Sequence, residues 1–208
     1  PALLEHPEVP HEIDEKGAAE LLLIAPGRTP GCGVIKNICE IKPGCCGFYS
    51  EKNGLETWEY WRLRAYELNE TFEQTVEHVR ELVLDSIRRQ LVSDVPVCTF
   101  LSGGLDSSLI SSVAAAEMKK QGKILDTFSV DYRDNDKYFQ KSHFQPNSDP
   151  EFITCMAEYL GTNHHWTVVD TPELADALTD AVEARGLPGM ADVDASLLIF
   201  CQIGRAHV

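Results

Sequence analysis

Residues 97–120 read VCTFLSGGLDSSLISSVAAAEMKK, and this stretch decides the fold class. VCTFL at 97–101 is a short, continuous apolar run, which is typical of a parallel strand buried on both faces. LISSVAAAEMKK at 109–120 is rich in alanine and amphipathic, which predicts a helix. The segment SGGLDSS at 102–108 therefore lies in a strand-to-helix turn.

The same alternation continues toward the C-terminus. The predicted elements are a strand at 124–132, a helix at 150–161, a strand at 164–169, and helices at 171–185 and from residue 194. A β-α-β-α-β order indicates an open parallel sheet with covering helices. We therefore expect an α/β fold.

Upstream of the strand, residues 71–91 predict the clearest helix of the chain. Its apolar positions recur every three or four residues, as Phe72, Val76, Val79, Val83, Ile87 and Leu91. Thr71 and Gln74 form a capping box at its start. We expect a structural helix that covers a sheet.

The first 60 residues carry weaker signals. Residues 1–20 are rich in proline and acids and predict a loop or a short helix. From Leu21 to Tyr49, the short apolar runs LLLIA and VIKNI alternate with Gly/Pro turns, which predicts a small β segment. Asn53-Gly54 favours a turn, and the aromatic stretch after it predicts a strand or an extended linker.

Composition excludes several classes of function. The 208 residues hold 18 Lys+Arg and 33 Asp+Glu, a net charge of −15, which argues against general binding to nucleic acid. An anionic ligand must therefore be held locally. No apolar run approaches the ~18 residues of a membrane span. Seven cysteines without a CxxC pair indicate reduced thiols and a cytoplasmic protein.

The turn SGGLDSS is the strongest chemical signal. Gly103 and Gly104 allow a positive φ and a close approach to a ligand, and the following helix start offers unpaired N–H groups to a phosphate. Ser102, Ser107 and Ser108 add hydroxyl groups. The alternative is a plain turn in which Asp106 or Ser107 merely caps the helix.

Asp106 points to a metal, because a carboxylate faces a phosphate favourably only through a cation such as Mg²⁺. The turn contains no lysine and does not match GxxxxGK[ST], so it is not a P-loop of the Walker A kind. Backbone, hydroxyl groups and metal must then neutralise the phosphate charge.

Other clusters have simpler explanations. His164 and His165 are neighbours on a predicted strand and point to opposite faces, so one ion cannot readily bind both. The acidic tract DYRDND at 131–136 indicates a solvated loop, with cation binding as the alternative. The cysteines at 32, 39, 45 and 46 match no zinc spacing.

Several motifs carry a family resemblance. SGGLDSS after an apolar strand resembles the PP-loop of the ATP pyrophosphatases, and VPVCTFLSGGLDSSLIS, DTFSVDY, EYLGTNHHWTVV and LPGMADVDASLL resemble glutamine-dependent asparagine synthetases. The resemblance implies a Rossmann-like parallel sheet of the adenine-nucleotide alpha-hydrolase type. It assigns 1–57 to the end of an N-terminal-nucleophile glutaminase domain with its linker, 58–202 to part of the synthetase domain, and 203–208 to a non-native tail.

That family activates the side-chain carboxylate of aspartate with ATP to form β-aspartyl-AMP and pyrophosphate. Ammonia released from glutamine then displaces AMP. The residues carried over for ATP are Ser102, Gly103, Gly104, Ser107 and Ser108 for phosphates, Asp106 for Mg²⁺, and Leu101 and Val130 for adenosine. Asp192 and Asp194 in MADVDAS are substrate-side candidates, although Asp194 can also cap a helix.

The resemblance also implies limits. The first cysteine is Cys32 rather than an N-terminal nucleophile, and the family's second phosphate loop is not reached, so we expect an internal fragment that is inactive alone. A homodimer of the full-length protein is left open. The alternatives are a ligase similar to β-lactam synthetase and a non-catalytic nucleotide-binding fragment.

Overall fold

The computed structural model describes residues 2–139 and 149–206, and the chain divides into two compact units. One unit contains residues 1–68 and 178–194, and the other contains 69–177 and 195–208. The domain boundary that the sequence places after residue 57 stays a prediction. The second unit carries the SGGLDSS turn and is described first.

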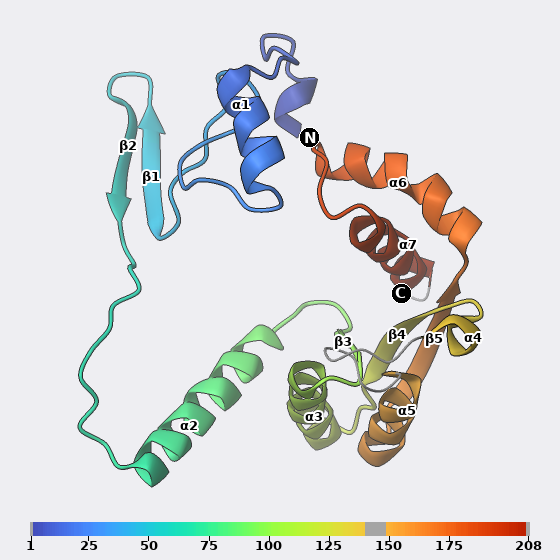
Figure 1. Ribbon diagram of the computed structural model, residues 1–208. Coiled ribbons are helices and arrows are strands. Elements are labelled where there is room, and N and C mark those ends of the chain that lie inside the picture. Colours follow the sequence, from blue (N-terminus) through green and yellow to red (C-terminus); the bar gives the residue numbers. More distant parts are fainter. Residues whose placement is uncertain (1, 140–148, 207–208) are drawn as a thin grey trace. The chain divides into compact units, whose positions relative to one another are not determined.

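A parallel sheet forms the centre of this second unit (Figure 1). Its strands lie in the order β3 (Cys98–Phe100), β4 (Asp126–Tyr132) and β5 (Asn163–Val169). The predicted β-α-β-α-β alternation and the α/β class are therefore confirmed. Phe100, Phe128 and His165 are register partners across the three strands.

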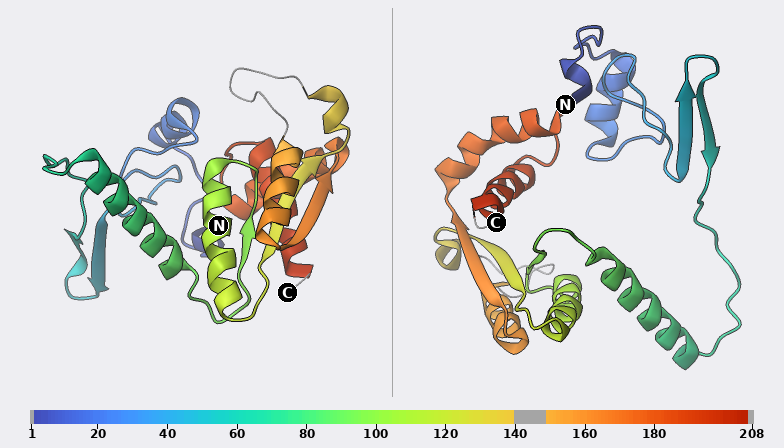
Figure 2. Two further views of the ribbon diagram at one scale, coloured as in Figure 1. Left: turned by 90° about the horizontal axis from the view of Figure 1, so that it is seen from below. Right: turned by 180° about the vertical axis from the view of Figure 1, so that it is seen from behind.

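Helices α3 (Leu105–Lys120) and α5 (Asp149–Leu160) lie side by side against one face of the sheet (Figures 1 and 2). The buried hydroxyl oxygens of Thr99 and Ser111 lie 2.8 Å apart and join β3 to α3. The apolar core under α5 consists of Leu101, Ile153 and Ala157, with Met156 packed against it.

An aromatic contact covers a different part of the sheet. Phe200, on α7 (Asp192–Ala206), has its ring centroid 4.4 Å from that of Phe100 and 6.5 Å from that of Phe128. Phe128 also stacks on His165 at 4.6 Å. The register partners Phe100, Phe128 and His165 thus form one row, and Phe200 packs on it.

Helix α2 (Phe72–Gln90) confirms the predicted helix and its capping box. Ile87, near its C-terminal end, is buried, whereas Phe72, Val76 and Val79 remain exposed. Its main packing partner is α3, not the sheet that we expected it to cover. Only part of the apolar stripe of α2 is therefore buried.

The remaining helices of the C-terminal half are α4 (Asn135–Tyr138) and α6 (Thr171–Arg185). The bounds of α6 agree with the predicted helix at 171–185. Within residues 2–139 and 149–206, no helix is long and apolar enough to cross a membrane.

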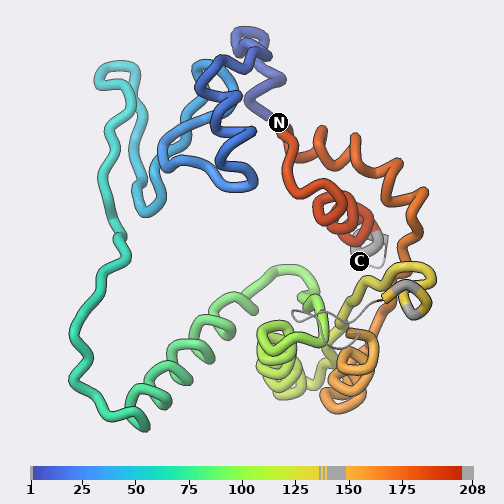
Figure 3. Tube along the Cα trace, in the orientation of Figure 1, coloured from blue at the N-terminus to red at the C-terminus, as the bar shows by residue number. Residues whose placement is uncertain are grey.

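The first unit contains short elements and one hairpin. A 3₁₀ turn at Ala2–Glu5 is followed by α1 (Glu15–Ala19), η2 (Glu20–Ile24), β1 (Cys45–Ser50) and β2 (Gly54–Glu59). The strands pair antiparallel around the predicted Asn53-Gly54 turn, where Gly54 has φ +69°. Residues 60–69 then run without a helix or strand (Figure 3).

The predicted strand at LLLIA is wrong, because these residues belong mainly to the helical turn η2. Asp14 accepts the N–H of Gly17 and caps α1 immediately before it. A short apolar run does not distinguish a strand from a buried helix by its periodicity. VIKNI also forms no extended strand, since Ile35 makes only a single bridge to Ile13.

Candidate functional site

The turn after β3 leaves a helix start open. Gly104 is the N-cap of α3 and makes no side-chain capping bond. The first backbone N–H groups of a helix have no partner within it, and glycine offers no side chain to satisfy them. The N–H groups of Leu105, Asp106 and Ser107 are therefore placed to receive an anion.

The two glycines of the turn have different roles. Gly103 has φ +75°, and a Cβ there would lie 3.1 Å from the carbonyl oxygen of Asp149 and from Cβ of Phe152. Gly104 has φ −77° and ψ 165°, which any residue adopts. Of the two glycines, only Gly103 therefore uses the positive φ that both allow.

The space beside Gly104 is open. A Cβ added at this position would meet only Oγ of Ser102, at 3.4 Å. Glycine here leaves room in front of the α3 N-terminus, where a ligand can approach the backbone closely.

Hydroxyl groups hold the turn together. Oγ of Ser107 accepts the N–H of Ser102 at 3.1 Å, lies 2.9 Å from Oγ of Ser102 and donates to the carbonyl of Gly104 at 3.1 Å. Oγ of Ser102 accepts the N–H of Gly104 at 3.4 Å. Neither Asp106 nor Ser107 caps the N–H groups of α3 among the described residues, so the plain-cap alternative loses its basis.

Asp106 lies in the first turn of α3 and is exposed. No group of three or more His, Cys, Asp or Glu side chains within the described ranges could hold a metal by itself. Mg²⁺ in nucleotide sites is commonly bound by one or two carboxylates together with phosphate oxygens and water. A single exposed carboxylate beside an anion-accepting helix start fits that donor set.

A cleft of about 210 Å³ adjoins the turn at the carboxyl ends of β3 and β4. It brings together Leu101, Ser102 and Val130, all of which the resemblance assigns to ATP. The other lining residues are Phe100, Phe128, Ser129, Tyr132, Asp149, Ile153 and Phe200. Ligands of open α/β sheets bind at this end of the strands.

Sequence reasoning missed part of this lining. Phe100 and Phe128 were read only as strand residues, and Phe200 lies about a hundred positions beyond β3. The sequence could have indicated Phe128, because residues two positions apart on a strand face the same side and Phe128 lies two positions before Val130. No local sequence pattern places Asp149 at the cleft, because Asp149 reaches the cleft only through the packing of α5 on Gly103.

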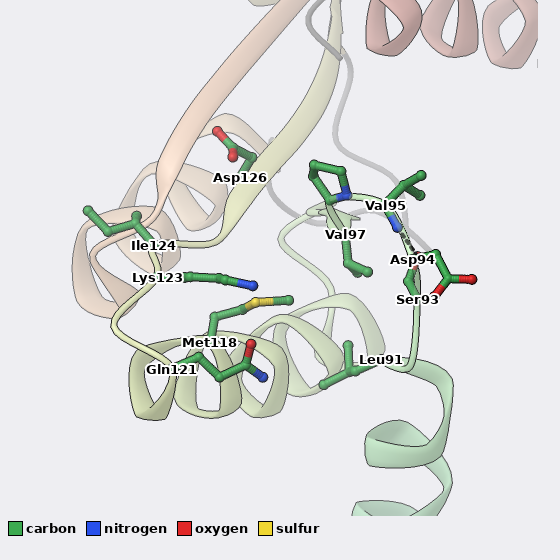
Figure 4. A pocket seen from close by; sticks show the side chains of 11 residues that line it. Leu91, Ser93, Asp94, Val95, Val97, Met118, Gln121, Lys123, Ile124 and Asp126 are labelled. Carbon is green, nitrogen blue, oxygen red and sulfur yellow. Dashed lines mark hydrogen bonds between the residues drawn. The ribbon is translucent and has the colours of Figure 1, made fainter.

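A larger hollow, of about 360 Å³, lies at the opposite ends of the strands (Figure 4). Its walls come from the segments that precede β3 and β4 and from the C-terminal end of α3, with Leu91, Val97, Met118 and Lys123 among them. It contains no residue of the SGGLDSS turn. Its position relative to the strands does not match a nucleotide site of this fold class.

Asp192 and Asp194 belong to the first unit. Asp192 is exposed at the start of α7, which begins two residues before the predicted helix. Both carboxylate oxygens of Asp194 lie 2.8 Å from Nη1 of Arg185, and Oδ2 accepts the N–H of Met190. A substrate-side role for either residue stays a prediction.

His164 and His165 point to opposite faces, as predicted. Nδ1 of His164 lies 2.8 Å from Oγ1 of Thr127, and Nε2 of His165 lies 2.9 Å from Oδ1 of Asp126. Burial, with a smaller contribution from the neighbouring His165, lowers the pKa of His164. The pair does not form a metal site within the described residues.

The acidic tract at 131–136 is engaged locally. Oδ1 of Asp131 accepts from the N–H of Tyr132 and from Nδ2 of Asn135, and Asp134 pairs with Lys137. β4 ends at Tyr132 and α4 begins at Asn135, so the predicted loop is wrong except at residues 133 and 134. Cation binding by this tract stays an untested alternative. Cys32, Cys39, Cys45 and Cys46 are free thiols.

Comparison with known proteins decides the family. A family model described as asparagine synthase matches residues 78–208, which include the turn, the sheet and the cleft. The chain belongs to the asparagine synthase family. This assignment confirms the family resemblance that the motifs carry.

Asparagine synthetase [glutamine-hydrolyzing] 3 of Bacillus subtilis is 50% identical over 202 residues, which cover 97% of this chain and 33% of that protein. Amidase chyE of Penicillium rubens is 31% identical over 118 residues, covering 56% of this chain and 17% of that protein. The chain thus spans a third or less of these relatives.

One solved structure also resembles the chain. NAD+ synthetase from Burkholderia pseudomallei covers 66% of this chain and 60% of its own, with 16% sequence identity and a TM-score of 0.34. A likeness this low carries no argument about function, and the α/β class stands on the sheet itself.

Proposed function

We propose that this chain supplies the ATP-binding PP-loop of a glutamine-dependent asparagine synthetase. The observation that carries the proposal is the uncapped N-terminus of α3, which opens beside the cleft at the carboxyl end of β3. Family membership gives this anion-accepting turn a substrate, because asparagine synthases are ATP-utilising ligases.

ATP lies across the turn and the cleft in this proposal. The SGGLDSS turn holds the β- and γ-phosphates, and Leu101 and Val130 contact the adenosine. The net charge of −15 makes a diffuse basic surface unavailable, so the anion is held by oriented backbone N–H groups.

Asp106 is the residue that would hold Mg²⁺. The cation would supply charge neutralisation for the leaving pyrophosphate, which the turn cannot supply because it has no lysine. The role of Asp106 is to fix that positive charge at the start of α3.

The proposed reaction has two steps. The side-chain carboxylate of aspartate attacks the α-phosphorus of ATP, the bond to the β-phosphate oxygen breaks, and β-aspartyl-AMP and pyrophosphate form. Ammonia, derived from glutamine in the longer protein, then displaces AMP and leaves asparagine. The chain contributes positioning and charge stabilisation, without a covalent nucleophile of its own.

Calorimetric titration of the chain with ATP and Mg²⁺ tests the proposal. We expect binding that weakens at least about tenfold in Asp106→Asn, because the metal-bridged contact to phosphate is lost. Asp94→Asn is the matched control, since Asp94 is an exposed acid that lines the larger hollow. Absence of ATP binding, or equal affinity in Asp106→Asn and wild type, would overturn the assignment.

Pyrophosphate release identifies the carboxylate substrate. Release that depends on aspartate supports an asparagine synthetase and shows that the chain is active alone. Release with another carboxylate, and none with aspartate, would favour the ligase similar to β-lactam synthetase. ATP binding without release is the outcome expected for a nucleotide-binding part of a longer enzyme.

A further inference from the structure

Tyr132, the last residue of β4, contacts the helix α7 through its hydroxyl. The hydroxyl oxygens of Tyr132 and Ser196 lie 2.9 Å apart, which is a hydrogen-bond distance. Ser196 is only 7% exposed, whereas Tyr132 is 43% exposed and lines the cleft. The contact therefore connects the wall of the cleft to a buried position on α7.

The hydroxyl of Ser196 is committed to this contact. Hydroxyl groups inside helices commonly bond back to the carbonyl four residues before, as those of Ser112 and Thr154 do. Within the residues that the structure describes, the hydroxyl of Ser196 bonds only to Tyr132. A helix hydroxyl that bonds to a different element fixes the position of its helix against that element.

A second contact joins the same helix to the same strand. Ser196 and Phe200 are four residues apart on α7 and share one face of the helix. Phe128 and Tyr132 are four residues apart on β4 and also share one face. The ring centroids of Phe200 and Phe128 are 6.5 Å apart. A polar contact and an aromatic contact thus fix both the position and the rotation of α7 on β4.

These contacts determine one wall of the cleft. Phe200 lines the cleft together with Tyr132 and with the adenosine-side residues Leu101 and Val130. Phe200 is buried, and its ring centroid lies 4.4 Å from that of Phe100. Since Phe200 reaches the cleft as part of α7, this wall stays in place only while α7 stays on β4.

We propose that Tyr132 is a positioning residue that holds α7 on β4, so that Phe200 closes the cleft around the adenosine part of ATP. The inference rests on the proposed ATP site and adds α7 to its adenosine end. The turn at 102–108 is held by its own hydroxyl contacts and does not use this one. Loss of the Tyr132 hydroxyl should therefore weaken binding of adenosine and leave binding of the phosphates unchanged.

Titration with ligands that carry adenosine or lack it tests this role. We would measure binding of AMP, of ATP with Mg²⁺ and of pyrophosphate with Mg²⁺ to wild type, Tyr132→Phe and Ser196→Ala. Each variant removes one hydroxyl of the contact and is expected to weaken AMP and ATP by about fivefold, with pyrophosphate unchanged. Tyr159→Phe is the matched control, since Tyr159 is 82% exposed on α5, and it is expected to bind all three ligands like wild type.

The double variant Tyr132→Phe/Ser196→Ala distinguishes one shared contact from two independent effects. Its AMP affinity is expected to equal that of the weaker single variant, because the contact is already absent in each of them. Multiplied losses in the double variant would overturn the proposal, as would wild-type AMP affinity in both single variants. Weaker AMP binding in Tyr132→Phe alone would make its hydroxyl a direct ligand, and equal weakening of AMP and pyrophosphate would indicate a general loss of the fold; each contradicts a positioning role.

Amide hydrogen exchange of the ligand-free chain measures the contact itself. The amides of residues 196–200 are expected to exchange at least about fivefold faster in Tyr132→Phe and Ser196→Ala than in wild type or Tyr159→Phe. Equal exchange in all four proteins would contradict a hold on α7. Failure of wild type to bind ATP would overturn the proposed function, yet the exchange experiment would still decide whether Tyr132 holds α7.

Discussion

Nη1 of Arg185 lies 2.8 Å from both carboxylate oxygens of Asp194, at the two ends of the segment that joins α6 to α7. Oδ2 of Asp194 also accepts the N–H of Met190 at 2.7 Å. A Cβ at Gly189 would lie 2.1 Å from this same oxygen, so a larger residue there would displace the side chain of Asp194 or Arg185. The carboxylate thus holds a loop closed.

Asp194→Ala is expected to lower the free energy of unfolding by about 1–3 kcal/mol, because a partly buried hydrogen-bonded charge is lost and Met190 loses its acceptor. Urea unfolding measures this change. Asp192→Ala is the control, with an expected effect within about 0.5 kcal/mol, since its side chain is exposed. Equal stability of the two variants would remove the loop-closing role of Asp194.

The glycines of the phosphate turn are expected to respond in opposite ways. Gly103→Ala should destabilise the chain by more than about 1 kcal/mol, because alanine is strained at φ +75° and meets Asp149 and Phe152. Gly104→Ala should cost less, at most about 1 kcal/mol from the N-cap preference for glycine over alanine, but weaken ATP binding, since its Cβ enters the open space before α3. Urea unfolding and calorimetry distinguish the two, and similar losses of stability would refute this division of roles.

His164 is expected to make stability depend on pH. Burial lowers its pKa in the folded state, so below the unfolded value of about 6.5 the unfolded chain binds the proton more readily. Stability is complete above that value and falls as the pH drops toward the folded pKa. The variant His164→Asn should lose less stability than wild type between pH 7.5 and 5.5 in urea unfolding, and equal losses would contradict the assignment.

The capping box of α2 gives two opposite predictions within one helical turn. Thr71→Ala should cost about 1 kcal/mol, because its Oγ1 accepts the N–H of Gln74. Thr75→Ala should be neutral or slightly stabilising, since its hydroxyl only bonds back to the carbonyl of Thr71. Amide exchange of residues 72–78 reports the change locally, and a loss of protection in Thr75→Ala equal to that in Thr71→Ala would argue against the cap.

The central sheet could be predicted because VCTFL is a continuous apolar run and all three strands are separated by clear turn and helix signals. Each strand was located within two residues, and the helix at 171–185 was located without error. The cap at Thr71 was equally accessible, since it depends on two side chains three positions apart.

Features that depend on distant parts of the chain could not be predicted in this way. Only packing against α5 shows that Gly103 is constrained and Gly104 is not. Phe200 joins the cleft through the path of the chain after α6, which no local pattern encodes. The helical turn at LLLIA was missed because a short apolar run suits either backbone state.

The open start of α3 has a consequence for how this site should be probed. Its anion-facing donors are main-chain amides at Leu105, Asp106 and Ser107, which remain in place when any of these side chains is cut back to alanine. An alanine scan would therefore register the proposed metal ligand Asp106 and the loop geometry, but not the proposed phosphate contacts of the main chain. Replacing the amide itself, for example by an ester linkage, reaches those contacts directly.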